Sequence, residues 1–398
     1  MEKRWCLKPT PDEACVAELS RVLNISETLT GLLVQRGVRT FETARAFFRP
    51  SLDDLIDPFL MCDMEKAVTR LGAALERGER IVVYGDYDAD GTTSVALVAG
   101  FLRRFHPDVD YYLPDRHREG YGLSRVGVDW AAERGATLII TLDCGIRAVE
   151  NVAYARRRGL DVIVCDHHEP GETLPDALAV LDPKRPDCDY PHADLSGCGV
   201  GLKLLWAYCL RHNVPTEALH RELDLLAVSI AADLVPMTGE NRVLVYHGLR
   251  QLEQNPRPGI RMLFERAGKV PLEDGTYELD VNDLVFIVAP RLNAAGRMEH
   301  ARLAVELLLA DTPEAARPAA EKLDDLNQRR RAYDQQNAQE ALDMIAEVVE
   351  FRDAPATVLF REGWHPGVAG IVASRCLSTH YRPTVILTAA GDDAEGRP

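Results

Sequence analysis

The sequence predicts an α/β protein built on a parallel sheet. From Ile81 onward, short apolar runs rich in Val and Ile alternate with segments that have helical apolar spacing and end in glycine. The strand-like runs are "IVVYG", "DYYLP", "LIITLDCG" and "DVIVCDHH", and the helical segments include "SRVGVDWAAERG" and "AVENVAYARRRG". This alternation is typical of parallel sheets, which bind ligands at the carboxyl ends of their strands.

Composition limits the class of protein. The 398 residues are enough for two or three domains, and 46% apolar with 27% charged residues is ordinary for a globular protein. No apolar run approaches the roughly 18 residues that span a bilayer, and the N-terminus lacks the apolar core of a signal peptide. We therefore expect a cytoplasmic location without membrane attachment. The nine cysteines form no C-x-x-C pair, which argues against a disulfide framework and a thiolate zinc site.

The net charge of −16 argues against a simple polycation that coats nucleic acid. It does not exclude a nucleic-acid enzyme, because an acidic metal site takes much of the negative charge to itself. Arginine supplies most of the 46 basic residues, and its guanidinium group suits bidentate phosphate contacts.

Four segments are expected along the chain. Residues 1–58 read as a small helical lead-in, with Ser and Thr caps in "ISETLTGLLVQRG" and "TFETARAFFRP". Residues 59–311 hold the parallel sheet. Residues 312–350 read as one long charged helix that begins with Thr312 as N-cap and Pro313 as its first residue. Residues 351–398 read as strand, loop, helix and strand, the start of a second α/β domain.

Three aspartates at alternate positions follow the first strand of the sheet. Asp86, Asp88 and Asp90 stand in "GDYDADGTTS", between a buried strand and a helix. Carboxylates this close repel one another, and each costs free energy unless a cation or a proton neutralises it. The cluster therefore indicates a metal site or proton chemistry.

Other elements bring further ligand types to the same edge. Asp143 follows "LIITL", Asp166, His167 and His168 follow "DVIVC", and Asp233 ends an apolar helix. Taken alone, a strand-end Asp is more often a helix N-cap; the coincidence on successive elements favours a site. Oxygen and imidazole ligands without thiolates suit Mn²⁺ or a similar divalent ion, and this many ligands fit two ions about 3.5 to 4 Å apart, as in phosphoester hydrolysis.

In this order and at these separations, "GDYDADGTTS", "LDCG", "DHH" and "AADLVPMTGENR" resemble the DHH phosphoesterase superfamily. More specifically, they are similar to its RecJ family of bacterial exonucleases. The resemblance continues in "APRLNAAGRM" and in "GWHPGVAGIVASR", which resembles the start of the DHH-associated substrate domain. It covers nearly the whole chain from Ile81 onward, and it implies a DHH domain joined by a long helix to a DHH-associated domain.

The resemblance implies roles for the strand-end residues. The implied catalytic residues are Asp88, Asp143, His167 and His168. The implied ligands of two Mn²⁺ or Mg²⁺ ions are Asp86, Asp88, Asp90, Asp143, His167 and Asp233, with Asp143 bridging. Many family members have a histidine where this chain has Tyr84. A phenol is a poor ligand because its pKa is about 10, so we expect Asp86 to serve the first ion.

The resemblance also implies substrate contacts. Arg291, Asn293 and Arg297 are expected to clamp phosphates, and Ser374 and Arg375 are expected to contact the DNA backbone. Without the resemblance, the first three read equally well as a glycine-containing turn with solvated arginines. Tyr121 and Trp364 are candidate stacking surfaces for bases, although packing explains each equally well.

The implied function is a single-stranded-DNA-specific 5′-to-3′ exonuclease of DNA repair and recombination. It would release 5′ mononucleotides by two-metal phosphodiester hydrolysis. A single-strand-binding protein and a RecQ-type helicase are expected partners of a monomer. The family's substrate domain normally continues into a glycine-rich stretch and a Gly-Gly-His motif, and RecJ proteins usually add an OB-type domain. Since this sequence stops at "GDDAEGRP", we expect a shortened form of such a protein.

Three alternatives have different consequences. A haloacid-dehalogenase phosphatase would use Asp88 as nucleophile and Asp90 as acid, but "GDY" separates its motif from the strand and the DHH triplet would have no role. A nanoRNase or cyclic-dinucleotide phosphodiesterase of the same superfamily would degrade short oligomers. A non-catalytic DNA-binding scaffold should have lost metal ligands, whereas only Tyr84 is aberrant here.

Overall fold

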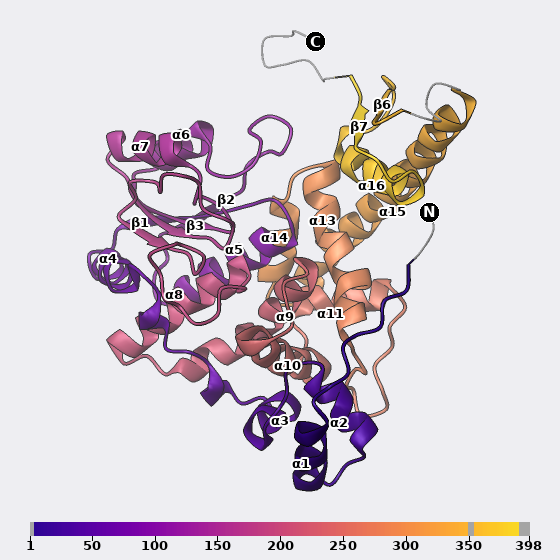
Figure 1. Ribbon diagram of the computed structural model, residues 1–398. Helices are drawn as coiled ribbons and strands as arrows, with labels where there is room; N and C mark the ends of the chain where they lie inside the picture. The colour runs from indigo at the N-terminus through magenta and orange to yellow at the C-terminus, as the bar shows by residue number, and fades with distance from the viewer. Residues whose placement is uncertain (1–3, 349–353, 390–398) are drawn as a thin grey trace.

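The computed structural model describes residues 4–348 and 354–389. The chain starts with a small group of helices that lies apart from the sheet (Figure 1). Its elements are α1 (Glu13–Leu23), α2 (Glu27–Val34), α3 (Phe41–Phe48) and the short turns η1 (Leu52–Asp54) and η2 (Pro58–Leu60). Side chains of Asp12, Ser26 and Thr40 cap the three helices, so the predicted Ser/Thr caps are confirmed for the last two.

A five-stranded parallel sheet forms the centre of the protein. Its strand order is β2-β1-β3-β4-β5, and every neighbouring pair is parallel. The strands are β1 (Arg80–Gly85), β2 (Val109–Tyr112), β3 (Ala136–Leu142), β4 (Asp161–Cys165) and β5 (Ala179–Leu181). The predicted α/β fold with a parallel sheet is therefore confirmed.

Helices cover both faces of this sheet. Alternate side chains of β1 and β3, such as Ile81 and Ile140, pack in one core with α4 (Met64–Glu76), α5 (Ala89–Leu102) and α8 (Gly197–His212). Intervening side chains, such as Val82 and Ile139, pack in a second core with α6 (Arg125–Glu133) and α7 (Val149–Arg157). Burial on both faces explains why the strands read as continuous apolar runs.

A set of helices follows the sheet and packs beside α5. It comprises η3 (Thr216–Glu222), α9 (Leu223–Ala232), α10 (Gly239–Gln254), α11 (Pro258–Arg266), α12 (Val281–Asp283), η4 (Leu284–Val288), α13 (Ala289–Met298) and α14 (Arg302–Leu309). Helices α5 and α9 are almost entirely buried. Their lack of a polar face shows that they form the interior of this half of the molecule.

The long helix α15 (Pro313–Glu347) leads to the C-terminal lobe (Figure 1). Thr312 caps it and Pro313 is its first residue, as predicted, and 35 residues make it about 50 Å long. The last two residues of the predicted helix, 349 and 350, lie outside the described residues. The lobe contains β6 (Thr357–Phe360), η6 (Pro366–Val368), α16 (Ala369–Thr379) and β7 (Thr384–Leu387), and Trp364 is buried in its core. In residues 4–348 and 354–389, no helix combines the length and apolarity needed to cross a membrane.

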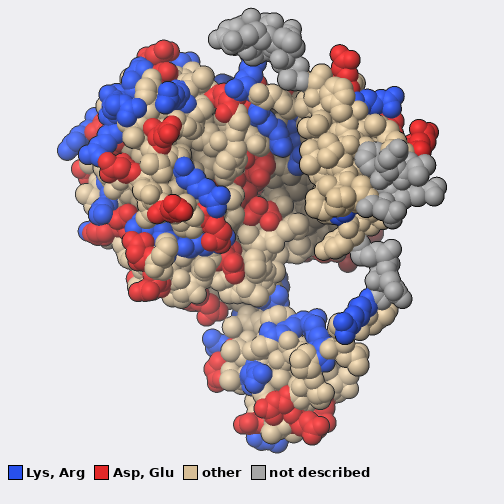
Figure 2. All heavy atoms as spheres, turned by 45° about the horizontal axis from the view of Figure 1, so that its top comes forward, with Lys and Arg blue, Asp and Glu red and all other residues tan. Residues whose placement is uncertain are grey.

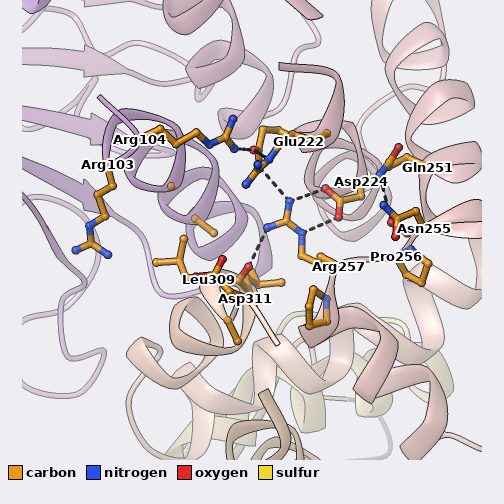
Figure 3. Close-up of a pocket in the computed structure, with 16 residues that line it drawn as sticks. Arg103, Arg104, Glu222, Asp224, Gln251, Asn255, Pro256, Arg257, Leu309 and Asp311 are labelled. Atoms are coloured by element: carbon orange, nitrogen blue, oxygen red, sulfur yellow. Dashed lines mark hydrogen bonds and ion pairs between the residues drawn. The ribbon is translucent and has the colours of Figure 1, made fainter. Parts of the chain in front are cut away.

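A buried ion-pair network ties α9 and α11 to the end of α5 (Figure 3). The Arg257 guanidinium donates to both carboxylate oxygens of Asp224, at 2.6 and 2.7 Å, and to Glu222 at 3.1 Å. Arg104, just past the end of α5, also pairs with Glu222. Burial, together with the nearby charges of Arg221 and Arg257, lowers the pKa of Arg104 to about 10. These groups line a cavity of about 570 Å³, whose lining includes none of the strand-end aspartates.

We expect Arg257→Ala to destabilise the fold strongly. Asp224 is almost fully buried, and losing Arg257 leaves its charge uncompensated, which costs about 3 to 5 kcal/mol. Glu222 keeps its pair with Arg104. Urea unfolding followed by tryptophan fluorescence measures this loss. Arg261→Ala is the matched control on α11, because Arg261 pairs with Glu265 at the exposed surface and should cost under about 1 kcal/mol. Equal losses for the two variants would contradict a supporting role for the buried network.

Candidate metal centre

The strand-end residues meet at one edge of the sheet. Asp143 directly follows β3, and Asp166, His167 and His168 directly follow β4. Asp233 is the C-cap of α9, which the fold brings to the same place. The strand-end residues that the sequence predicts to lie together are therefore close to one another in the structure.

The turn between β1 and α5 brings Asp86 and Asp88 close to each other. Asp88 is the N-cap of α5, and its Oδ1 accepts a hydrogen bond from the Gly91 amide at 3.0 Å. A Cβ on Gly91 would lie 2.4 Å from the Asp86 carbonyl oxygen, so only glycine fits there. The close approach of Gly91 to the Asp86 backbone allows the turn to present Asp86 and Asp88 side by side.

Asp90 is held by neighbouring helices. Its Oδ2 accepts from the Gly197 amide at 2.7 Å, and its Oδ1 accepts from the Cys198 amide at 3.0 Å and from the Ser229 hydroxyl at 2.7 Å. Two of these donors belong to the first turn of α8, where free N–H groups and the helix dipole favour an anion. The Asp90 carboxylate is therefore fixed in position before any cation binds.

Asp143 occupies the centre of the cluster. Its backbone has a φ of 59°, the left-handed conformation, and its Oδ1 lies 3.1 Å from His167 Nε2. The same imidazole nitrogen lies 3.6 Å from Asp90 Oδ2 and 3.7 Å from Asp233 Oδ2. Gly197 packs against Asp143, since a Cβ there would lie 2.6 Å from the Asp143 Cβ.

Two groups of side chains have the spacing of metal ligands. Asp86, Asp88 and Asp143 form one group, and Asp90, His167 and Asp233 form another; within each, one ligand atom per residue lies within 4.8 Å of the others. A third such group joins Asp143 to His167 and His168. Asp143 thus belongs to the first group and also contacts His167 of the second.

The electrostatics of the cluster fit a divalent cation. Burial, and then the charge of Asp88, raises the pKa of Asp86 to about 8. Burial, and then the negative charges of Asp90 and Asp88, raise the pKa of Asp233 to about 7. The same causes raise the pKa of Asp143 well above its usual value. Within the described part of the chain, the buried Asp86 Oδ1 and His167 Nδ1 have no hydrogen-bond partner. Oxygen and imidazole donors in this number suit Mn²⁺ or Mg²⁺, so the residues present fit such ions.

His168 lies at the rim of the centre rather than in its floor. Its Nδ1 is 2.7 Å from Asp166 Oδ1 and 3.2 Å from the Tyr121 hydroxyl, while its side chain is 43% exposed. The hydrogen bond to Asp166 raises the pKa of His168. Tyr121 also donates to the Asp143 carbonyl at 2.9 Å. These contacts hold the His168 ring where an incoming substrate can reach it.

The side chain of Tyr84, on β1, packs in the second core of the sheet and not in the aspartate cluster. It is fully buried, stacks on Tyr112, and donates its hydroxyl hydrogen to the Gly122 carbonyl at 2.9 Å. Burial raises its pKa further above the usual value for a phenol. A packed, protonated phenol has no capacity to bind a cation, which leaves Asp86 as the nearby ligand of the first set.

The residues predicted to bind substrate lie on two helices, α13 and α16. On α13, Arg291 is buried and pairs with Asp324 of α15 at 2.9 Å, and Asn293 accepts a hydrogen bond from the Ala89 amide at 2.8 Å. Arg297 donates to the Gly367 carbonyl at 3.2 Å. The negative charge of Asp88 acts on Arg297 and favours its protonated form. On α16, Ser374 and Arg375 are exposed, and Arg375 pairs with Asp334 at 2.8 Å.

The structure adds three residues to the predicted site. Asp166 orients both histidines, because its carboxylate accepts from the amides of His167 and His168. Asp182 follows β5, is buried, and has its pKa raised to about 7, mainly by burial. Arg116 lies over the Tyr87 ring at 4.9 Å and lowers the pKa of Asp86. The strand-end rule applied to β2 and β5 would have found Arg116 and Asp182 as well.

A cleft separates the sheet-bearing part from the C-terminal lobe. Figure 2 shows this hollow with acidic and basic side chains exposed along its walls. Contacts between Arg297 of α13 and Gly367 of η6 connect its two sides.

Comparison with known proteins places this site in context. Residues 80–230 match the model of the DHH family, N-terminal domain. The chain is 40% identical to the single-stranded-DNA-specific exonuclease RecJ of Bacillus subtilis, over 96% of this chain and 47% of that protein. It is 38% identical to the Escherichia coli RecJ, over 92% of this chain and 64% of that protein. The chain thus spans about half to two thirds of the length of these curated relatives.

Solved structures give the same relationship. A crystal structure of an exonuclease RecJ bound to manganese matches with 35% identity and a TM-score of 0.75, covering 85% of this chain and 82% of the other. RecJ from Thermus thermophilus in complex with Mn²⁺ matches with 32% identity and a TM-score of 0.80, covering 95% of this chain and 53% of the other.

We expect the affinity for Mn²⁺ to rise with pH up to about pH 8 and to level off above it. Asp233 and Asp86, with pKa values of about 7 and about 8, must lose protons before they bind a cation. Calorimetric titration of the metal-free chain in two buffers of different ionisation enthalpy measures affinity and proton release together. Asp86→Asn should flatten the upper part of this dependence, and Asp189→Asn, at an exposed position, should leave it unchanged. An affinity independent of pH, without proton release, would contradict the raised pKa values.

Proposed function

Because the chain belongs to the RecJ family of single-stranded-DNA-specific exonucleases, we propose that it hydrolyses single-stranded DNA from the 5′ end and releases 5′ mononucleotides. The observation that carries this proposal is the pair of ligand sets at one sheet edge, with Asp143 between them. Two divalent ions held side by side are the arrangement used for in-line phosphodiester hydrolysis. The proposed substrate and polarity rest on the family, and the chemistry rests on the site.

In this proposal Mn²⁺ or Mg²⁺ binds at both sets. Asp86, Asp88 and Asp143 hold the first ion, and Asp90, His167, Asp233 and Asp143 hold the second. When bound, the two ions lower the pKa of water and neutralise negative charge on the phosphoryl oxygens. The buried aspartates supply the negative charge that attracts both cations, and the hydrogen bonds to Asp90 keep that ligand in place without reorganisation.

The chain's other residues orient the substrate. His168, partly exposed and held through Nδ1 by Asp166, presents its imidazole to the attacked phosphate and donates a hydrogen bond there. Arg297 lies near Asp88 and clamps a phosphate oxygen. Ser374 and Arg375 contact the backbone of the strand farther along. Metal chemistry thus belongs to the sheet-bearing part of the chain, and part of the substrate contact belongs to the C-terminal lobe.

The biological setting proposed here is DNA repair and recombination in the cytoplasm. The chain acts as a monomer on single strands, in company with a single-strand-binding protein and a RecQ-type helicase. Co-purification with each candidate, at matched salt, tests these associations separately from the chemistry.

A degradation assay tests the proposed activity. Single-stranded DNA labelled at the 5′ or the 3′ end, a duplex of the same sequence and a short RNA oligomer are incubated with Mn²⁺ or with a chelator. We expect Mn²⁺-dependent release of the 5′ label as mononucleotide, with slow loss of the 3′ label. Preference for the short RNA would instead assign a nanoRNase activity, and DNA binding without cleavage would assign a scaffold.

We expect Asp143→Ala to reduce hydrolysis at least about 1,000-fold, because it removes the carboxylate that we propose binds both ions. Steady-state rates on 5′-labelled DNA with saturating Mn²⁺ measure the effect. Asp189→Ala, an exposed aspartate after β5, should retain wild-type rates. Near-normal turnover of Asp143→Ala would rule out its bridging role.

A further inference from the structure

Helix α13 contacts the metal-binding turn on one side and the C-terminal lobe on the other. In Figure 1 it lies between α14 and the helices α15 and α16. On the turn side, Asn293 reaches the first residue of α5 and Gly296 packs on Tyr87. On the lobe side, Arg297 reaches Gly367. The helix is therefore in a position to influence the geometry of Asp86 and Asp88.

The contact made by Asn293 is specific. Its side-chain oxygen accepts a hydrogen bond of 2.8 Å from the Ala89 amide. Ala89 is the first residue of α5, and its N–H group is one of the four that no helical carbonyl can satisfy. The neighbouring cap, Asp88, satisfies the Gly91 amide instead. Asn293 lies more than 200 residues farther along the chain and supplies an acceptor for this N–H group.

The approach of α13 to this turn is close. A Cβ on Gly296 would lie 2.4 Å from the Tyr87 carbonyl oxygen, so the helix backbone touches the turn directly. Tyr87 stands between Asp86 and Asp88. The turn is therefore held by backbone contact at Tyr87 and by a hydrogen bond at Ala89, on either side of Asp88.

We propose that Asn293 is a positioning residue for the first metal cluster, Asp86, Asp88 and Asp143. By fixing the Ala89 amide it fixes the start of α5, and with it the direction of the Asp88 carboxylate. This role differs from a phosphate clamp, because it uses the side-chain oxygen as an acceptor, whereas a clamp would use the NH2 group as a donor to phosphate. The inference rests on the proposed two-metal function and adds a residue outside the ligand set.

Removing a residue that supports a metal ligand typically weakens metal binding about 10- to 100-fold. Asn293→Leu keeps the side-chain size and removes the acceptor, and we expect it to weaken Mn²⁺ binding about tenfold. Asn293→Asp keeps an acceptor oxygen, and we expect it to restore binding to within about threefold of wild type. Asn282→Leu, at an exposed asparagine of α12, is the matched control and should bind like wild type.

The experiment titrates the metal-free chain with Mn²⁺ and follows the electron paramagnetic resonance signal of the free ion. In parallel, the affinity for 5′-labelled single-stranded DNA is measured with chelator present, and thermal unfolding without metal checks that each variant folds. We expect weaker Mn²⁺ binding by Asn293→Leu with unchanged metal-free DNA affinity. If Asn293→Leu does not fold, Asn293→Ala takes its place, with the same expectation.

Two results would overturn this inference and leave the proposed two-metal function intact. One is wild-type Mn²⁺ affinity in Asn293→Leu, particularly with weaker DNA binding, which would make Asn293 a substrate contact. The other is equal weakening in Asn293→Leu and Asn293→Asp, which would show that the acceptor does not matter. A wild-type chain that binds no Mn²⁺ would overturn the metal centre itself, and this inference with it.

Discussion

Repulsion among buried carboxylates is the constraint on which the rest of this structure depends. Asp86, Asp90 and Asp143 are each at most 3% exposed and lie at one edge of the sheet with Asp88 and Asp233. The fold offsets part of the cost with backbone amides of α8, a hydroxyl and an imidazole. The remainder is visible as raised pKa values, and divalent cations are the natural means of removing it.

The helices that carry these ligands are anchored at their far ends. Helix α5 begins at the turn that holds Asp86 and Asp88 and ends beside Arg104, while α9 begins beside Asp224 and ends at Asp233. The pairs that Arg104 and Arg257 make with Glu222 join these far ends. Both helices are buried along their length, so this ion-pair network sets their relative position. It therefore also sets the distance between the candidate ligands at their opposite ends, Asp88 at the start of α5 and Asp233 at the end of α9.

Much of the site could be predicted because parallel strands deliver their carboxyl ends to one edge. Asp143, His167 and the Asp86 turn needed only correct strand assignments, which the apolar runs supplied. The surroundings of Arg291 and Asn293 could not be predicted this way. Their contacts, Asp324 and Ala89, depend on how α13 packs against α15 and α5, and no local pattern in "PRLNAAGR" encodes that packing.

The most direct test of the central claim is to locate the ions. A crystal of the chain soaked in Mn²⁺ gives anomalous scattering peaks at each bound ion. The account predicts two peaks about 3.5 to 4 Å apart, one beside Asp86 and Asp88, the other beside Asp90 and His167, with Asp143 contacting both. A single peak, or two peaks without a shared Asp143 ligand, would contradict it.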